Sequence, residues 1–123
     1  MQLDHITVHV ADMQRSAHFY ETILGLDPIP EPFHDGLHLW YRIGPTLSIH
    51  VVGGATGNPT RSIQHHFAFR VPSLDPIMQR LDQHHIPCRN LQGDARVNIR
   101  PDGLRQIYLQ DPDGYWIEIN EAG

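Results

Sequence analysis

Alternation of apolar and polar residues predicts seven strands in this chain. The clearest is "LDHITVHV" (3–10), which alternates and is rich in β-branched residues, as expected of a strand with one buried face. Turn signals at Gly44-Pro45 and Asp113-Gly114 mark two points where strands are joined. The other strands are predicted over residues 36–44, 46–52, 65–71, 86–91, 105–110 and 115–120.

Two segments have the spacing of helices instead. Asp12 can cap a helix that runs from Met13 to about Leu24 and stops at Gly25. Ser73 can cap a second helix, whose apolar residues recur at helical intervals. That apolar face carries Leu74, Ile77, Met78 and Leu81.

The second half of the chain repeats the first. The segment "HITVHVAD" (5–12) aligns with "HFAFRVPS", which lies 61 positions further on, and "RIGPTLSIHV" (42–51) aligns with "QDPDGYWIEI", 68 positions further on. Each half is predicted to contain a strand, a helix and then antiparallel strands. We expect one α+β domain over 1–123, with module one over about 1–53, a Gly/Pro-rich connector over about 53–63, and module two over about 64–123.

The repeat also relates four ionisable side chains. It places His5 opposite His66, and His50 opposite Glu118. Successive strand residues point to opposite faces, and each of these four lies on the face that its strand's apolar residues leave open. If the sheet curves so that the open faces look inward, the four side chains meet in one concave space.

Three imidazoles and a carboxylate are suitable ligands for a divalent first-row ion. The sequence therefore predicts a metal site formed by His5, His50, His66 and Glu118, with Zn, Ni, Mn or Fe as the ion. Such an ion would offset the cost of placing Glu118 within a strand, and its net positive charge would suit an anionic small molecule. For His50 the alternative is a cavity residue that binds substrate or water.

Other side chains share the open faces and are candidates for substrate binding. Arg42 and Arg70 can bind a carboxylate in bidentate fashion. For every member of this set the alternative is a packed or solvent-exposed side chain near the rim. The set comprises Thr7, His9, Trp40, Arg42, Arg70, Tyr108 and Trp116.

Composition narrows the expected partners. The chain has 123 residues, 40% of them apolar and 19% charged, and a net charge of −5, which argues against a nucleic-acid partner. Its one cysteine, Cys88, cannot form a disulfide within the chain, so a reducing, cytoplasmic location is expected. No signal-peptide pattern and no apolar run of membrane-spanning length is present, and no membrane partner is expected.

Three segments resemble the vicinal oxygen chelate superfamily: "DHITVHVADMQRSAHFYETILGL", "HHFAFRVPSLDPIMQRL" and "DPDGYWIEIN". This superfamily includes glyoxalase I, fosfomycin-resistance thiol transferases, methylmalonyl-CoA epimerases, extradiol dioxygenases and bleomycin-resistance proteins. The resemblance implies two βαβββ modules that form a curved, eight-stranded mixed sheet around a metal-binding cup, and a homodimer. It assigns metal ligation to His5, His66 and Glu118, with His50 at the fourth ligand position.

The resemblance implies several activities. His50 stands where glyoxalase I usually has Glu and epimerases commonly have Gln, and Thr7 follows His5 as the catalytic threonine does in fosfomycin transferases. The leading expectation is a metal-dependent lyase or isomerase that acts on a small substrate chelated through adjacent oxygens, with Glu118 as general base and Thr7 as a second catalytic candidate. The alternatives are a non-haem iron dioxygenase using two histidines and one carboxylate, a thiol-transferase resistance enzyme, and a non-catalytic binding protein.

Overall fold

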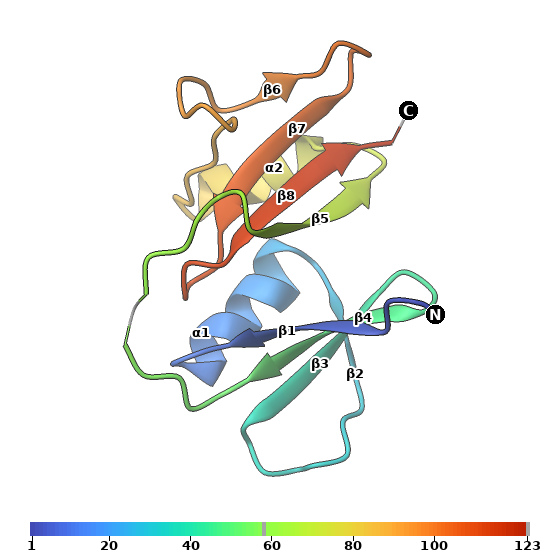
Figure 1. Cartoon of the computed structure of the whole chain (residues 1–123), viewed down its shortest axis with the longest axis vertical. Coiled ribbons are helices and arrows are strands. Elements are labelled where there is room, and N and C mark those ends of the chain that lie inside the picture. Colours follow the sequence, from blue (N-terminus) through green and yellow to red (C-terminus); the bar gives the residue numbers. More distant parts are fainter. Residues whose placement is uncertain (58, 123) are drawn as a thin grey trace. The chain divides into compact units, whose positions relative to one another are not determined.

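The structure, a computed structural model, describes residues 1–57 and 59–122. The chain divides into two compact units, Met1–Asn58 and Pro59–Gly123. Each unit consists of a strand, a helical segment and three further strands, in that order (Figure 1). The predicted α+β fold with two βαβββ modules is confirmed.

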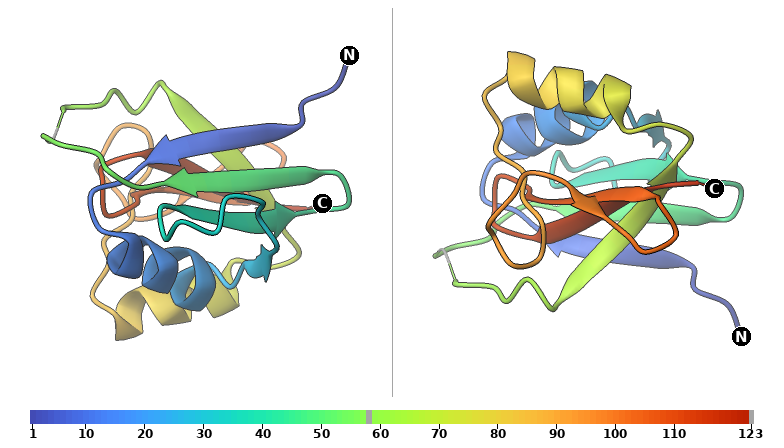
Figure 2. Two further views of the ribbon diagram at one scale, coloured as in Figure 1. Left: turned by 90° about the horizontal axis from the view of Figure 1, so that it is seen from below. Right: turned by 90° about the horizontal axis from the view of Figure 1, so that it is seen from above.

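The two units have the same topology, and in each the helical segment lies against one face of the unit's own sheet (Figure 2). In each sheet the first strand pairs in parallel with the last, and the other pairs are antiparallel. The first sheet has the order β1-β4-β3-β2 and the second β5-β8-β7-β6. The elements of the first unit are β1 (His5–His9), α1 (Met13–Ala17), η1 (His18–Ile23), β2 (Asp27–Ile29), β3 (His38–Ile43) and β4 (Leu47–Val52). Those of the second are β5 (His66–Val71), α2 (Asp75–Gln83), β6 (Asn98–Ile99), β7 (Arg105–Gln110) and β8 (Trp116–Glu121).

Strand register agrees with the sequence repeat. In the parallel pairs, Thr7 lies beside His50 and Ala68 lies beside Glu118. In the antiparallel pairs, Trp40 lies beside His50, just as Tyr108 lies beside Glu118. Every one of these relations is the one that the offsets of 61 and 68 residues require.

The first helix begins where the sequence predicts. The Asp12 side chain accepts a hydrogen bond from the backbone N–H of Arg15 (3.1 Å). From His18 onward the helix widens into the π-helical segment η1, in which the N–H of Leu24 donates to the carbonyl of Phe19 five residues earlier (2.9 Å). Gly25, with a φ of 73°, follows this segment.

The second helix starts one residue later than a Ser73 cap would place it. Leu74 is the N-cap, and the Ser73 hydroxyl accepts a hydrogen bond from the N–H of Asp75 (3.2 Å). The N–H of Leu74 donates to the Glu121 carboxylate (2.9 Å), which ties the start of α2 to the end of β8. The predicted apolar face is confirmed for Leu74, Ile77 and Leu81, which are buried.

Some predicted strands differ from the observed ones. The strand expected over 86–91 is reduced to one bridge between Arg89 and Tyr108. Two edge strands were not predicted, because β2 contains Pro28 and β6 has only two residues. The eight strands form two four-stranded sheets rather than one continuous sheet.

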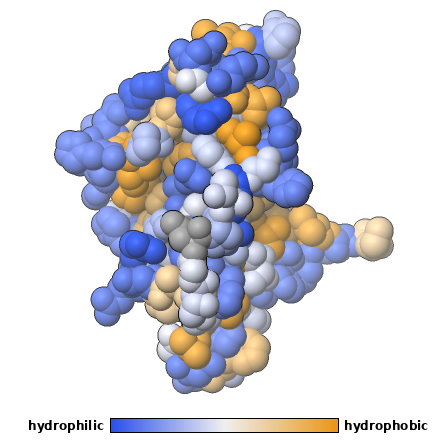
Figure 3. Space-filling model, turned by 60° about the vertical axis from the view of Figure 1, so that its left-hand side comes forward, coloured by the Kyte–Doolittle hydropathy of each residue, from blue (hydrophilic) through white to orange (hydrophobic). Residues whose placement is uncertain are grey.

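Each sheet buries one face and leaves the other for polar and aromatic side chains. In the first unit Val8, Ile49 and Val51 are fully buried, and in the second Ile107 and Ile117 are. Large apolar side chains that remain exposed include Phe33, Leu37 and Ile99, and Figure 3 shows apolar residues in separate patches on a largely hydrophilic face. Among the helices of the described residues, none has the length and apolar character needed to cross a bilayer.

Candidate functional site

Three rings from adjacent strands stack on the open face of the first sheet. The ring centroids of His5 and His50 are 3.9 Å apart with planes 12° apart, and those of His50 and Trp40 are 4.0 Å apart with planes 4° apart. His5 comes from β1, His50 from β4 and Trp40 from β3, and these strands are neighbours in the sheet. The structure therefore brings together the two predicted metal ligands of module one, with Trp40 as an aromatic support.

The stacking restricts what His50 can do. An imidazole lone pair lies in the plane of its ring, so two nearly parallel stacked rings do not direct their lone pairs at one point. Burial, followed by the charge of nearby His5, lowers the pKa of His50 below its ordinary value, so the neutral ring predominates at pH 7. In this conformation His50 supplies a flat neutral surface, and its ring would have to turn before it could share an ion with His5.

Hydrogen bonds leave one nitrogen of His5 available. Its Nδ1 lies 2.7 Å from the Asp4 carboxylate, a contact that favours the tautomer with the proton on Nδ1. The His50 Nε2 lies 3.1 Å from the Ser48 hydroxyl. His5 can thus bind a cation through Nε2, whereas in His50 it is Nε2 that contacts a neighbour.

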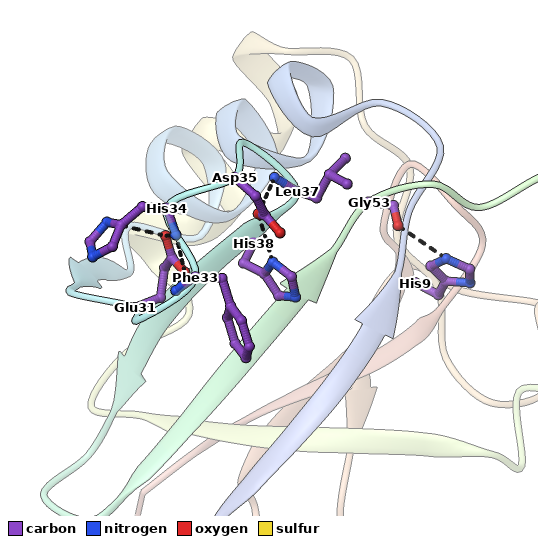
Figure 4. A network of polar contacts seen from close by, with 8 residues as sticks. All are labelled: His9, Glu31, Phe33, His34, Asp35, Leu37, His38 and Gly53. Atoms are coloured by element: carbon purple, nitrogen blue, oxygen red, sulfur yellow. Dashed lines mark hydrogen bonds and ion pairs between the residues drawn. The ribbon is translucent and has the colours of Figure 1, made fainter.

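A loop before β3 extends the aromatic surface (Figure 4). The Glu31 carboxylate accepts hydrogen bonds from the N–H groups of Phe33 (2.7 Å) and His34 (3.0 Å), which fixes the turn. The Phe33 ring then stacks on His38 at 4.1 Å and meets Trp40 edge-on at 6.4 Å. A connected series of aromatic rings therefore lies on this open face, formed by His5, His50, Trp40, Phe33 and His38.

In the second unit, His66 and Glu118 form the other predicted pair. The His66 Nδ1 lies 2.8 Å from the Ile63 carbonyl oxygen, which can only accept, so Nδ1 carries the proton. The lone pair is left on Nε2, which lies 3.5 Å from Oε1 of Glu118. A backbone carbonyl that orients an imidazole in this way is a common support for metal-binding histidines.

Two side chains hold the Glu118 carboxylate. The Tyr108 hydroxyl donates to Oε1 (2.9 Å) and the Asn120 amide donates to Oε2 (2.6 Å). Burial, followed by the hydrogen bond to Glu118, raises the pKa of Tyr108 to about 12, so the phenol keeps its proton at neutral pH. Glu118 is therefore half-buried yet satisfied, and its position is fixed from two sides.

Asn120 was not among the residues predicted for the site, although it shares the face of Glu118. Its own carbonyl oxygen accepts a hydrogen bond from Nε of Arg70 (3.1 Å). Arg70 is thereby linked to Glu118 through Asn120, and its role in binding a substrate carboxylate stays a prediction. Alternation along β8 was the signal that could have identified Asn120.

The remaining candidates lie on the open faces without joining either pair directly. Thr7 and Arg42 are exposed on the first sheet, and the His9 Nε2 lies 3.2 Å from the Gly53 carbonyl oxygen. The Trp116 indole donates to the Arg61 carbonyl (3.1 Å). Within the described residues, no three His, Cys, Asp or Glu side chains lie close enough together to hold a metal ion; the four predicted ligands form two pairs, one in each unit.

Comparison with known proteins identifies the family. The sequence model of the Glyoxalase/Bleomycin resistance protein/Dioxygenase superfamily matches residues 2–119. The chain belongs to this superfamily. It is 25% identical over 124 residues to the uncharacterized protein YwbC of Bacillus subtilis, with 96% of this chain and 95% of the relative covered.

Two further similar proteins carry functional names. The chain is 24% identical over 125 residues to Glyoxylase I 4 of Arabidopsis thaliana, with 95% of this chain and 68% of the relative covered. It is 26% identical to the solved structure of Oxidase ChaP-H2, with a TM-score of 0.81 and coverage of 100% of this chain and 94% of that one. The family model establishes the superfamily, whereas these two similar proteins are named for different chemistries.

Proposed function

We propose that this protein is a metal-dependent enzyme of the glyoxalase-like type, with lyase or isomerase chemistry on a small substrate that has adjacent oxygens. The observation that carries the proposal is the pair in the second unit: a histidine whose Nε2 lone pair is left free, 3.5 Å from a half-buried carboxylate. The name of the Arabidopsis relative supports the same reaction class.

The donor set fits a divalent cation. His66 and Glu118 would hold it together with His5, and His50 would join as a fourth ligand if its ring turned out of the stack. We propose that the two pairs complete one site, from one chain or from the two chains of a homodimer. When bound, the ion would act as a Lewis acid that stabilises negative charge on a substrate oxygen.

Glu118 is the group best placed to move a proton. Its two oxygens are oriented by Tyr108 and Asn120, so the carboxylate can accept a proton from a substrate carbon without first reorienting. Tyr108 retains its proton at neutral pH, so its single O–H continues to hold Oε1 of Glu118 in place.

The test is metal affinity and activity in matched variants. We expect metal-stripped protein to bind Zn²⁺, Ni²⁺ or Mn²⁺ in calorimetric titrations, and Glu118→Gln and His66→Gln to weaken that binding by at least about tenfold. His65→Gln is the matched control, because His65 is the exposed histidine next in sequence, outside the paired strand. The loaded wild-type protein should consume the hemithioacetal of an aldehyde and a thiol.

Full metal affinity in Glu118→Gln would refute the assignment of this carboxylate as a ligand. Equal losses in His65→Gln and His66→Gln would show that the effect is not specific to the pair. If the loaded wild-type protein binds metal normally but leaves the hemithioacetal unchanged, the lyase assignment is refuted and the metal-site assignment stands.

A second candidate is iron-dependent oxygenation. Without His50, which is held in the stack, the remaining predicted ligands are two histidines and one carboxylate, the set used by non-haem iron oxygenases. The relative named Oxidase ChaP-H2 supports this alternative. Oxygen uptake by Fe²⁺-loaded protein, with no turnover by the Zn²⁺ or Ni²⁺ forms, would favour it over lyase chemistry.

A further inference from the structure

The second unit contains a cavity of about 460 Å³ beside Tyr108. Pro87, Cys88 and Leu109 give it apolar walls, and Trp116 adds an indole ring. Among the described residues that line it, Arg89, from the segment before β6, is the cationic one. Most of the surface suits an apolar ligand, and Arg89 adds a single positive charge.

Arg89 is held rigidly in this wall. Its Nε donates to the carbonyl of Asn90 (3.1 Å) and its Nη2 to the carbonyl of Leu91 (2.7 Å). The guanidinium lies so close to Gly93 that a Cβ there would come within 3.1 Å of Cζ. The same group lies 5.4 Å from the centroid of the Trp116 ring. A Cβ at position 93 would press on the guanidinium, and the φ of 79° at Gly93 independently favours glycine.

The charge of Arg89 is not paired with a carboxylate in the described part of the chain. Among the residues that the structure describes, no carboxylate lies within 4.0 Å of its nitrogens. Its two hydrogen bonds go to neutral carbonyls and use two of five N–H donors. A rigid cation beside an apolar cavity, with three donors remaining, is a preorganised receptor for an anion.

We infer that this cavity binds a small planar acid, an aryl or conjugated carboxylate. The carboxylate pairs with Arg89, and the planar part packs on Trp116 and the apolar walls. One guanidinium matches a singly charged anion better than a doubly charged phosphate ester. Tyr108 lines the cavity and also donates to Glu118, so the cavity adjoins the proposed base. The inference deepens the proposed function by naming a substrate class. Binding of the acid does not depend on that function, but its conversion by the enzyme rests on it.

NMR titration of the metal-free protein tests the inference with benzoate as the probe and benzamide as its neutral counterpart. We expect benzoate to shift the signals of the Trp116 indole N–H and the Arg89 Nε–H, and benzamide to bind at least about tenfold more weakly. Arg89→Gln should reduce benzoate affinity to the level of benzamide, and Arg89→Lys should keep part of it. Arg100→Gln is the control, because Arg100 is paired with Asp102 and does not line the cavity.

Equal affinity for benzoate and benzamide, or full benzoate affinity in a folded Arg89→Gln protein, would overturn the inference. Phenyl phosphate binding more tightly than benzoate would overturn the assignment to carboxylates. Glu118→Gln separates the two proposals: benzoate binding that persists while metal affinity falls supports the inference. Absence of benzoate binding to a wild-type protein that binds metal normally would overturn this inference alone.

Discussion

Replacing Asn90 with Ala tests whether one buried amide holds the loop that carries Arg89. Asn90 is 7% exposed. Its Oδ1 accepts hydrogen bonds from the N–H groups of Gly93 (2.8 Å), Asp94 (3.1 Å) and Ala95 (3.3 Å). Its Nδ2 donates to the Asp94 carboxylate at 2.6 Å. An Ala side chain can make none of these four contacts.

The expected loss follows from the quality of these bonds. A neutral hydrogen bond contributes about 0.5–1.5 kcal/mol net, and one to a charged group about 1.5–3 kcal/mol. The 3.3 Å contact is weak, and water can reach part of the loop once the amide is gone. We therefore expect Asn90→Ala to lower the free energy of unfolding by about 2–3 kcal/mol, or the Tm by roughly 6–15 °C for a chain of this length.

Urea denaturation measures the loss, which should lower the midpoint at an unchanged m value. Asn98→Ala is the control, because that amide makes one hydrogen bond, to Gln106 (3.0 Å), on a two-residue edge strand. In Asn90→Ala the amides of residues 93–95 should also exchange faster with solvent, and benzoate affinity should fall with the order of the loop. A midpoint for Asn90→Ala no lower than that of Asn98→Ala would refute the reasoning.

Two titrations test the electrostatics of the open faces. The pKa of His50 should lie below 6.5 by NMR, and His5→Phe, which keeps a stacked ring but removes the charge, should raise it only partly, because burial remains. In the wild-type protein, His50 binds its proton more readily in the unfolded state than in the folded state. The free energy of unfolding therefore rises with pH between the folded-state pKa of His50 and about 6.5. An unchanged His50 pKa in His5→Phe would contradict the repulsion assigned to His5. In ultraviolet titration the pKa of Tyr108 should be about 12, and Glu118→Gln should bring it closer to 10; no change would show that the carboxylate does not act on the phenol.

The sequence repeat predicted where the backbones of both pairs, His5 with His50 and His66 with Glu118, lie in their sheets. Equal offsets along the sequence require the same strand register in each unit. Once Thr7 is beside His50, an equivalent second unit must place Ala68 beside Glu118, as observed. Alternation then determines which side chains share a face, and it places Asn120 on the face of Glu118, although Asn120 was not among the residues predicted for the site.

The repeat and the alternation could not predict the directions in which the side chains point. Parity places His5 and His50 on one face, but whether their rings converge on an ion or stack depends on rotamers and on the neighbouring ring of Trp40. Arg89 shows a second limit. Its guanidinium is held by carbonyl groups of the turn at Asn90 and Leu91. The strand expected over 86–91 therefore gave no indication of a cation beside a cavity.

The two units use equivalent positions for different chemistry. Trp40 and Tyr108 occupy the same place in the repeat, next to His50 and Glu118 respectively. The indole can only cover its neighbour, which keeps that imidazole buried and neutral. The phenol donates a hydrogen bond to its neighbour, which keeps that carboxylate oriented. Duplication of one module therefore explains the shared geometry, whereas the residues at the equivalent positions differ: Trp40 and His50 give the first unit a stacked aromatic surface, and Tyr108 and Glu118 give the second a hydrogen-bonded carboxylate.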